Sequence, residues 1–259
     1  MKQLWTIVKS YKILYLATLL NAGMFLVSSV GLLLDSRQLL GENIWLKPAK
    51  FGASIVIYLI TMAALLSIYP YTKKRKQQLA WIFGGTMILE MPLLLIQVIR
   101  GVPSHFNIST PFNGFVFGAM GILIFLNSLG LIWMMITAFT KRLETSQPMQ
   151  RAVQFAWVGM LVSMAAGQLM ISAMQHSVGV ADGGVGIPIT NWSAEGGDWR
   201  AVHFLGMHGI QLLPLMVYFL QDRIKSVALN RLVWISGVFY LLLIVFIFMR
   251  TQRGVPLFS

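Results

Sequence analysis

Seven apolar runs, each long enough to cross the roughly 30 Å hydrocarbon core of a bilayer, fill most of this 259-residue chain. They lie at about 14–34, 51–69, 79–99, 115–139, 152–175, 201–220 and 232–249. Hydrophobic residues make up 57% of the chain and charged residues 11%, whereas about a quarter of the residues in a soluble domain carry charge. The sequence therefore predicts an all-α polytopic membrane protein, with a single bundle of seven transmembrane helices over residues 1–259.

Basic residues divide unevenly between alternate loops of this predicted bundle. Thirteen of the 20 Lys and Arg residues fall at the amino terminus and in the loops of the same side, and seven fall on the other side. Lys and Arg are enriched in cytoplasmic loops, so we expect a cytoplasmic amino terminus and an external carboxyl terminus. The formal net charge of +12 then indicates contact with anionic membrane lipids. Because the charges are dispersed among short loops, they do not indicate nucleic-acid binding.

One predicted external connection, from His176 to Arg200, is much longer than the others. Loops of this length usually carry function or are disordered. This one contains turn-forming residues at Asp182-Gly183-Gly184, Gly186-Ile187-Pro188 and Gly196-Gly197-Asp198. We expect an ordered external loop over residues 176–200, folded across the mouth of the bundle. A merely solvated loop is the alternative.

All four histidines, and the only carboxylate inside an apolar run, fall toward the predicted external side. His105, His176 and His203 lie at the membrane face, and Glu90 and His208 lie about 12–14 Å inside it. Ionisable side chains are costly in hydrocarbon, so a cluster in one half of the bilayer indicates a site. The inner half holds no ionisable group, which favours an external pocket over a path through the membrane.

Helical periodicity places further polar residues beside this histidine cluster. At 100° per residue, the polar side chains of three apolar runs share one face of each helix. These residues are Gln97, Gln168, Ser172, Gln175 and Gln211, with Arg100 at the external rim. Their alternative role is hydrogen bonding between helices, at about 0.6 kcal/mol each in membranes.

The leading functional hypothesis is a membrane-embedded metal-binding protein with an externally facing pocket. His105, His176 and His203 are its candidate ligands, because neutral imidazoles suit zinc, copper or iron. Asp182 or Asp198 would add a carboxylate from the external loop. Three protein ligands leave an open position for water or substrate, which suits a membrane-embedded metalloenzyme, and the sequence leaves open whether the protein is an enzyme.

Glu90 and His208 are the candidate catalytic residues. Their similar depth predicts that they share a proton and act as general acid and base at the floor of the pocket. Pro92 frees a helix carbonyl one turn earlier, which adds an acceptor near this pair. By contrast, we expect the exchange of Asn127 for Leu, in the inner half, to have little effect.

Two other classes of protein remain open. The same polar face could belong to a metal-free protein that binds or transports a lipid or another small molecule, with apolar flanks for acyl chains. A redox protein with one haem near the surface, between His176 and His203, is the third class.

The tetrapeptide Arg-Gly-Val-Pro occurs twice, at residues 100–103 and 253–256. Each copy follows an apolar run that is predicted to lead outward. This spacing predicts two three-helix units, in parallel, joined by the fourth helix.

Four motifs resemble those of an uncharacterised group of bacterial multi-spanning membrane proteins. They run from Trp45 to Phe51, from Arg100 to Asn107, from His176 to Pro188 and from Gly196 to His203. The resemblance covers nearly the whole chain. It implies a multi-pass protein of the bacterial inner membrane, and it implies no activity.

Overall fold

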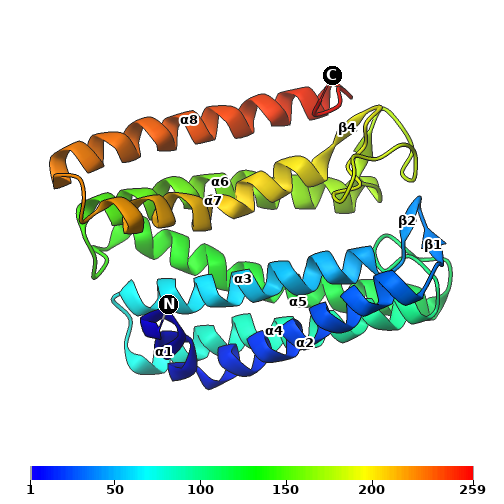
Figure 1. Ribbon diagram of the computed structural model, residues 1–259, viewed down its shortest axis with the longest axis horizontal. Coiled ribbons are helices and arrows are strands. Elements are labelled where there is room, and N and C mark those ends of the chain that lie inside the picture. The colour runs from blue at the N-terminus through cyan, green and yellow to red at the C-terminus, as the bar shows by residue number, and fades with distance from the viewer. Residues whose placement is uncertain (1, 259) are drawn as a thin grey trace. The chain divides into compact units, whose positions relative to one another are not determined.

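The computed structural model describes residues 2–258, with side chains from Leu4 onward. In this part of the chain it has eight helices and four strands of two residues (Figure 1). The helices are α1 (Lys2–Ser10), α2 (Lys12–Leu34), α3 (Leu46–Ile68), α4 (Lys73–Ile99), α5 (Pro111–Thr140), α6 (Gln147–Ala173), α7 (Trp199–Leu220) and α8 (Ser226–Gln252). The strands are β1 (Gln38–Leu39), β2 (Glu42–Asn43), β3 (Ser177–Val178) and β4 (Gly197–Asp198).

Seven of these helices, α2 to α8, are long and apolar enough to cross a membrane. The predicted all-α, multi-pass fold class is therefore confirmed, and most of the helices extend a few residues beyond the predicted runs. Helix α1 was not predicted, because nine residues are too few to span a bilayer. Its Trp5 ring contacts the Tyr15 ring of α2 edge to face, with 5.4 Å between the centroids.

The chain divides into two compact units. Unit 1 ends at Thr137 and contains α1 to α4 with most of α5, and unit 2 begins at Ala138 and contains α6 to α8. The single domain over residues 1–259 stays a prediction.

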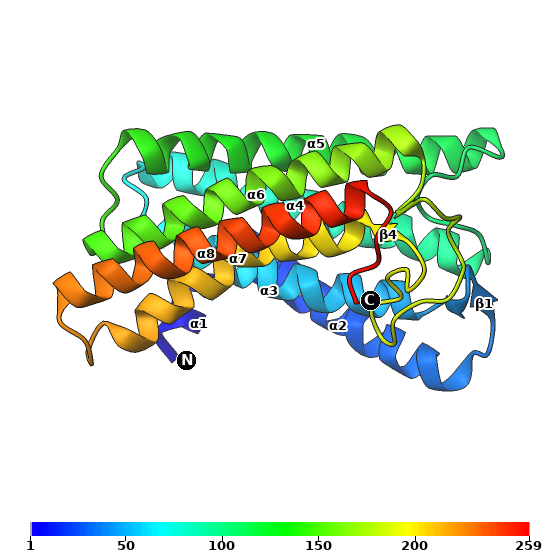
Figure 2. The same cartoon turned by 90° about the horizontal axis from the view of Figure 1, so that it is seen from above.

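Glycines bring the helices of unit 1 close together. Helices α2, α3 and α4 pack against one another in this unit (Figures 1 and 2). A Cβ atom at Gly52 of α3 would lie 3.0 Å from the backbone of Phe25 in α2. One at Gly84 of α4 would lie 3.0 Å from Ile13 of α2. Backbones that approach this closely gain dispersion contacts, which drive helix association in membranes.

Glycines also bring the three helices of unit 2 close together. A Cβ atom at Gly206 of α7 would lie 2.6 Å from the carbonyl oxygen of Gly159 in α6. One at Gly237 of α8 would lie 2.4 Å from the Phe155 ring of α6. In both units, therefore, the second and third helices each place a glycine against the first.

These glycines stand at matching positions in the two units. Gly52 follows Trp45 by seven residues, and Gly206 follows Trp199 by seven residues. In each unit the second strand of a two-stranded antiparallel sheet, β2 or β4, ends just before that tryptophan. A paired strand thus leads into the second helix of each unit.

The third helices of the two units also match, up to their last turn. Gly84 precedes Arg100 by 16 residues and Gly237 precedes Arg253 by 16 residues, and both helices are 27 residues long.

Each Arg-Gly-Val-Pro copy forms the carboxyl-terminal cap of such a helix. Its glycine has a φ of 70°, which favours glycine, and two backbone N–H groups return to the last helical turn as in a Schellman motif. The bonds are Gly101 to Val98 at 2.9 Å, Val102 to Gln97 at 3.1 Å, Gly254 to Thr251 at 2.9 Å and Val255 to Arg250 at 3.1 Å. The structure thus supports two three-helix repeats, α2–α4 and α6–α8, which come before and after α5 in the sequence.

Candidate functional site

Glu90 is buried inside unit 1 without a partner. It lies in α4 and is 1% exposed, and neither of its carboxylate oxygens has a hydrogen-bond partner within residues 2–258. Pro92 lies two residues further along the same helix and has no N–H, so the Ile88 carbonyl lacks its usual donor. An ionised carboxylate in such surroundings costs several kcal/mol, so the group requires a proton or a bound cation.

A chain of hydrogen bonds crosses three helices of unit 1 one turn from Glu90. The Tyr58 hydroxyl of α3 donates to the side-chain oxygen of Asn127 in α5, at 2.7 Å. The Asn127 amide donates to the Thr86 hydroxyl of α4 at 2.8 Å, and Thr86 donates to the Ile82 carbonyl at 2.7 Å. Because Thr86 precedes Glu90 by four residues, both side chains lie on one face of α4.

A second polar cluster lies toward the carboxyl-terminal end of α4. One guanidinium nitrogen of Arg100 donates to the side-chain oxygens of Gln97 and Asn113, both at 2.6 Å. The Gln97 amide also donates to Asn113, at 3.2 Å, and both of these side chains are buried. The structure therefore brings together Gln97, Arg100 and Asn113 of α5, and the role of the first two as pocket residues stays a prediction.

Together these groups form a line of buried polar side chains in unit 1, which we call the polar column. It consists of five buried residues and the half-buried Tyr58; the buried ones are Thr86, Glu90, Gln97, Asn113 and Asn127. From Thr86 to Gln97 it covers about 16 Å along α4. Sequence analysis missed Tyr58, Asn113 and Asn127, because the periodicity of one helix does not show which residues of another helix face it. The spacing of four residues between Thr86 and Glu90 does indicate that these two side chains share a face of α4.

His105, the predicted metal ligand of unit 1, lies among aromatic rings. Its ring centroid is 5.7 Å from that of Phe51 and 6.4 Å from that of Phe117. Its Nδ1 atom lies 2.9 Å from the Ser104 hydroxyl.

The other two predicted ligands, His176 and His203, belong to unit 2. In the part of the chain that the structure describes, no three His, Asp or Glu side chains are grouped so that they could hold a metal ion. Metal binding by these histidines therefore stays a prediction.

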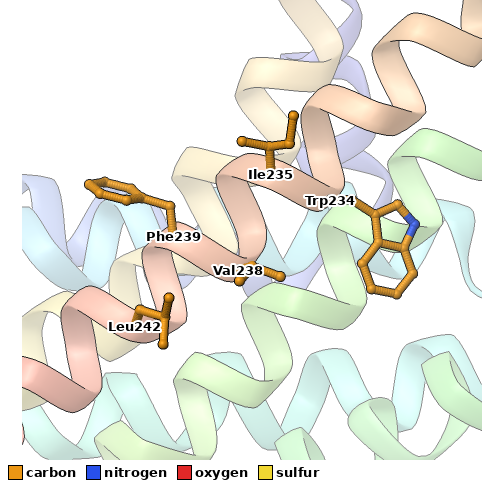
Figure 3. A pocket seen from close by; sticks show the side chains of 5 residues that line it. All are labelled: Trp234, Ile235, Val238, Phe239 and Leu242. Atoms are coloured by element: carbon orange, nitrogen blue, oxygen red, sulfur yellow. The ribbon is translucent and has the colours of Figure 1, made fainter.

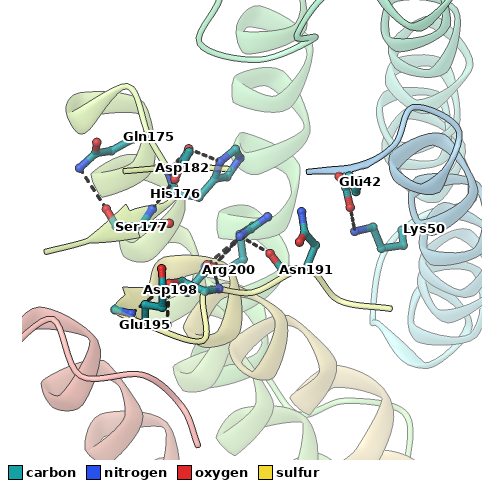
Figure 4. A network of polar contacts seen from close by, with 12 residues as sticks. Glu42, Lys50, Gln175, His176, Ser177, Asp182, Asn191, Glu195, Asp198 and Arg200 are labelled. Atoms are coloured by element: carbon teal, nitrogen blue, oxygen red, sulfur yellow. Dashed lines mark hydrogen bonds and ion pairs between the residues drawn. The ribbon is translucent and has the colours of Figure 1, made fainter. Parts of the chain in front are cut away.

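His176 and Asp182 point toward one another in the loop of unit 2 (Figure 4). The Nδ1 atom of His176 lies 2.7 Å from a carboxylate oxygen of Asp182, and the backbone N–H groups of His176 and Ser177 donate to the same carboxylate. Burial alone raises the pKa of Asp182, but these hydrogen bonds outweigh it and hold that pKa well below its usual range. The aspartate is thus an ionised anchor of the loop.

Asp198 anchors the other end of this loop. Its buried carboxylate accepts bonds from the backbone N–H groups of Ser193 and Arg200, both at 2.8 Å, and caps the start of α7. The Arg200 guanidinium lies 2.6 Å from it and also donates to the Asn191 carbonyl (Figure 4). Asp182 and Asp198, both predicted metal ligands, therefore bind donors within their own loop.

Helix α6 ends earlier than the predicted run over 152–175. It ends at Ala173, because Met174 adopts a left-handed conformation with a φ of 54°. Gln175 and His176 therefore do not lie on its face, and the Gln175 amide donates instead to the Ser177 carbonyl at 3.0 Å.

Two further predicted pocket residues, Gln168 and Ser172, lie on α6 itself. Both are exposed, and the Ser172 hydroxyl donates to the Gln168 carbonyl one turn back, at 2.9 Å. Their role as pocket residues stays a prediction.

The two histidines of α7 have different neighbours. His203 places its Nδ1 atom 2.8 Å from the Ser163 carbonyl of α6, and because a carbonyl only accepts, that nitrogen carries a proton. The Ser163 hydroxyl in turn donates to the His203 carbonyl at 2.7 Å. The His208 ring lies 4.2 Å from the Phe204 ring, with the Gln211 side chain beside it. Glu90 lies in unit 1 and His208 in unit 2, so their predicted proton-sharing pair stays a prediction.

An apolar hollow lies on the surface of α8. Five side chains line it: Trp234, Ile235, Val238, Phe239 and Leu242 (Figure 3). Almost all of their atoms are apolar, so this surface suits acyl chains and carries no reaction chemistry.

The fold and the buried polar groups define an integral, multi-pass membrane protein. No protein-family model, curated protein or solved structure matches this chain.

Proposed function

We propose that this protein is a metal-independent transporter of a small molecule in the bacterial inner membrane, and that Glu90 is its proton-binding group. The observation that carries the proposal is the buried carboxyl of Glu90, which has no partner within residues 2–258. Intramembrane carboxyl groups mark ion and substrate pathways, and proton relays in transporters are built from them.

A change in the protonation of Glu90 would affect the hydrogen bonds of the neighbouring side chains. A neutral carboxyl is tolerated in this environment, whereas the ionised form needs donors. On the same face of α4 the Thr86 hydroxyl is one turn away, and it is linked through Asn127 to Tyr58. Loss of the proton would therefore favour a rearrangement of these bonds between α3, α4 and α5.

The two three-helix repeats favour transport over catalysis. Many secondary transporters consist of structural repeats, and their binding sites lie near the middle of the membrane beside interrupted helices. Glu90 and Thr86 lie in the interior of α4, which is continuous but contains Pro92, and the continuous helix α7 also contains an interior proline, Pro214. Each proline leaves one helix carbonyl without its usual donor. The polar column extends past Glu90 to Asn127, whereas the sequence predicted that the site stays in the outer half.

Substrate-dependent proton flux tests this proposal. Purified protein in liposomes that contain a pH-sensitive dye would be exposed to a panel of small molecules. We expect flux with one class of compound, loss of flux in Glu90→Gln, and normal flux in Asp222→Asn, which changes an exposed carboxylate outside the spans. Flux that persists in Glu90→Gln would remove Glu90 from the mechanism.

Infrared difference spectra across a pH jump test proton binding without a known substrate. A protonated carboxyl inside the membrane gives a carbonyl band, which we expect to be missing in Glu90→Gln and retained in Asp222→Asn. A wild-type spectrum without such a band would contradict the proposal.

The same preparation distinguishes the alternative proposals. Binding of zinc, copper or iron through His105, His176 and His203 predicts stoichiometric metal by elemental analysis, lost when these residues are exchanged for Ala. A haem between His176 and His203 predicts a Soret band. General acid and base catalysis by Glu90 and His208 predicts that His208→Ala abolishes function as completely as Glu90→Gln does.

A further inference from the structure

A basic hollow lies in unit 2 at the junction of α5 and α6. Lys141, Arg142 and Arg151 contribute three cationic side chains to its lining, and the lining contains no carboxylate. The side chains of Lys141 and Arg142 are exposed and are therefore available to a ligand. Like charges gathered in one hollow repel one another, so the arrangement favours a bound anion.

Buried groups fix the shape of this hollow. Leu143 is 2% exposed and anchors the connection between the two helices. The Gln150 side chain accepts from the Leu143 N–H and donates to the Lys141 carbonyl, both at 3.2 Å. The Gln154 amide donates to the Ala138 carbonyl at 2.9 Å. The backbone that carries Lys141 and Arg142 is therefore held in place before any ligand arrives.

Arg151 has a defined orientation as well. One of its guanidinium nitrogens donates to the Gln154 side chain at 3.1 Å, and the guanidinium lies 5.5 Å from the centre of the Trp234 ring. These contacts place a positive charge at one wall of the hollow. The hydroxyl of Thr145 also lines it and is a potential donor to an oxyanion.

We propose that this hollow binds the phosphate group of an anionic phospholipid. It lies where two membrane helices end, which is the depth of the lipid headgroups, and basic pockets at this depth bind such headgroups. Phe139 of α5 also lines the hollow and is 51% exposed, so it can contact the glycerol or the first part of an acyl chain. Cations with an adjoining apolar wall fit a lipid phosphate better than a free phosphate ion.

Native mass spectrometry of the full-length protein in detergent tests this site. Phosphatidylglycerol and phosphatidylcholine would be titrated separately into wild type and into the double variant Lys141→Gln/Arg142→Gln. Each cation near an anionic lipid contributes roughly fivefold to affinity, so we expect about thirtyfold weaker phosphatidylglycerol binding in the double variant. Phosphatidylcholine binding should not change.

The matched control is Lys73→Gln/Lys74→Gln, which removes two exposed charges at the start of α4, outside the hollow. We expect it to bind phosphatidylglycerol as wild type does. An equal loss in both double variants would show diffuse attraction and overturn the proposal. Equal affinity of wild type for the two lipids would overturn it as well. Competition by inorganic phosphate at a concentration comparable to the lipid would assign the hollow to free phosphate instead.

Discussion

At the scale of single residues, Asn127 connects three helices of unit 1 through one side chain. Its oxygen accepts from Tyr58 and its amide donates to Thr86, and all its polar atoms are removed from lipid. The sequence predicted that Leu at this position does little, because Asn127 lies in the inner half of the bundle, away from the histidine cluster. The structure changes that expectation, since Leu would leave a buried tyrosine hydroxyl without its acceptor.

We therefore predict that Asn127→Leu lowers the free energy of unfolding by about 1–2 kcal/mol, the usual cost of a buried polar group that loses its partner. The measurement is the thermal midpoint in detergent, followed by size-exclusion chromatography. Tyr58→Phe/Asn127→Leu should recover part of the loss, because it removes the stranded hydroxyl too. A single variant as stable as wild type would show that these bonds contribute nothing.

Asp182 makes the stability of its loop depend on pH. Hydrogen bonds from His176 and Ser177 hold its folded-state pKa below the unfolded value of about 3.9. Its contribution is therefore present above that unfolded pKa and is lost as the pH falls through the lower, folded pKa. We predict that limited proteolysis cuts the loop over 176–200 equally slowly at pH 7 and at pH 5.

Asp182→Asn should speed that cleavage at both pH values, because the amide cannot replace the anion that three N–H groups share. Glu195→Gln, in the same loop, is the control. If Asp182→Asn resists the protease as wild type does, the carboxylate is not the anchor of the loop.

At the scale of helices, close backbone contacts predict which glycines are indispensable. A Cβ atom at Gly206 would lie 2.6 Å from a carbonyl oxygen of α6, whereas one at Gly121 of α5 would meet nothing within 4 Å. We predict that Gly206→Ala lowers the free energy of unfolding by about 2 kcal/mol and that Gly121→Ala leaves it unchanged or slightly higher. Detergent melting curves of the two variants give the comparison. Equal thermal midpoints of the two variants would mean that the close contact between α6 and α7 at Gly206 does not contribute to stability.

The sequence predicts the membrane spans well, because a span follows from the length of an apolar run. It predicts poorly the features that depend on contacts with other segments of the chain. The seven spans follow from apolar length, and their ends shift where a cap intervenes, as Met174 does in α6. Strands of two residues leave no periodic pattern, and α1 is amphipathic but too short to be read as a membrane span. Glu90 is identifiable because it is the only carboxylate in a span, but its neighbours Tyr58 and Asn127 lie on other helices, whose facing sides the sequence does not give.

At the scale of the whole molecule, the distribution of Lys and Arg predicts which ends of the helices are cytoplasmic. Reporter fusions after residues 77, 146 and 226 should give cytoplasmic signals, and fusions after 110 and 188 should give external signals. The fusion after 188 is the most decisive, because it lies in the loop that carries Asp182. A cytoplasmic signal there would reverse the orientation of the polar column in the membrane.

The matching caps of α4 and α8 also bear on how the molecule arose. Counting ten residues back from the capping arginine gives Glu90 in α4 and Leu243 in α8. The two helices share their length, their contact glycine and their terminal turn, yet only one has a carboxyl at this position. A duplicated ancestor would explain the shared framework, with one copy specialised for chemistry and the other for support. The double variant Glu90→Gln/Leu243→Glu would then test whether a carboxyl in α8 can replace the function of the carboxyl in α4.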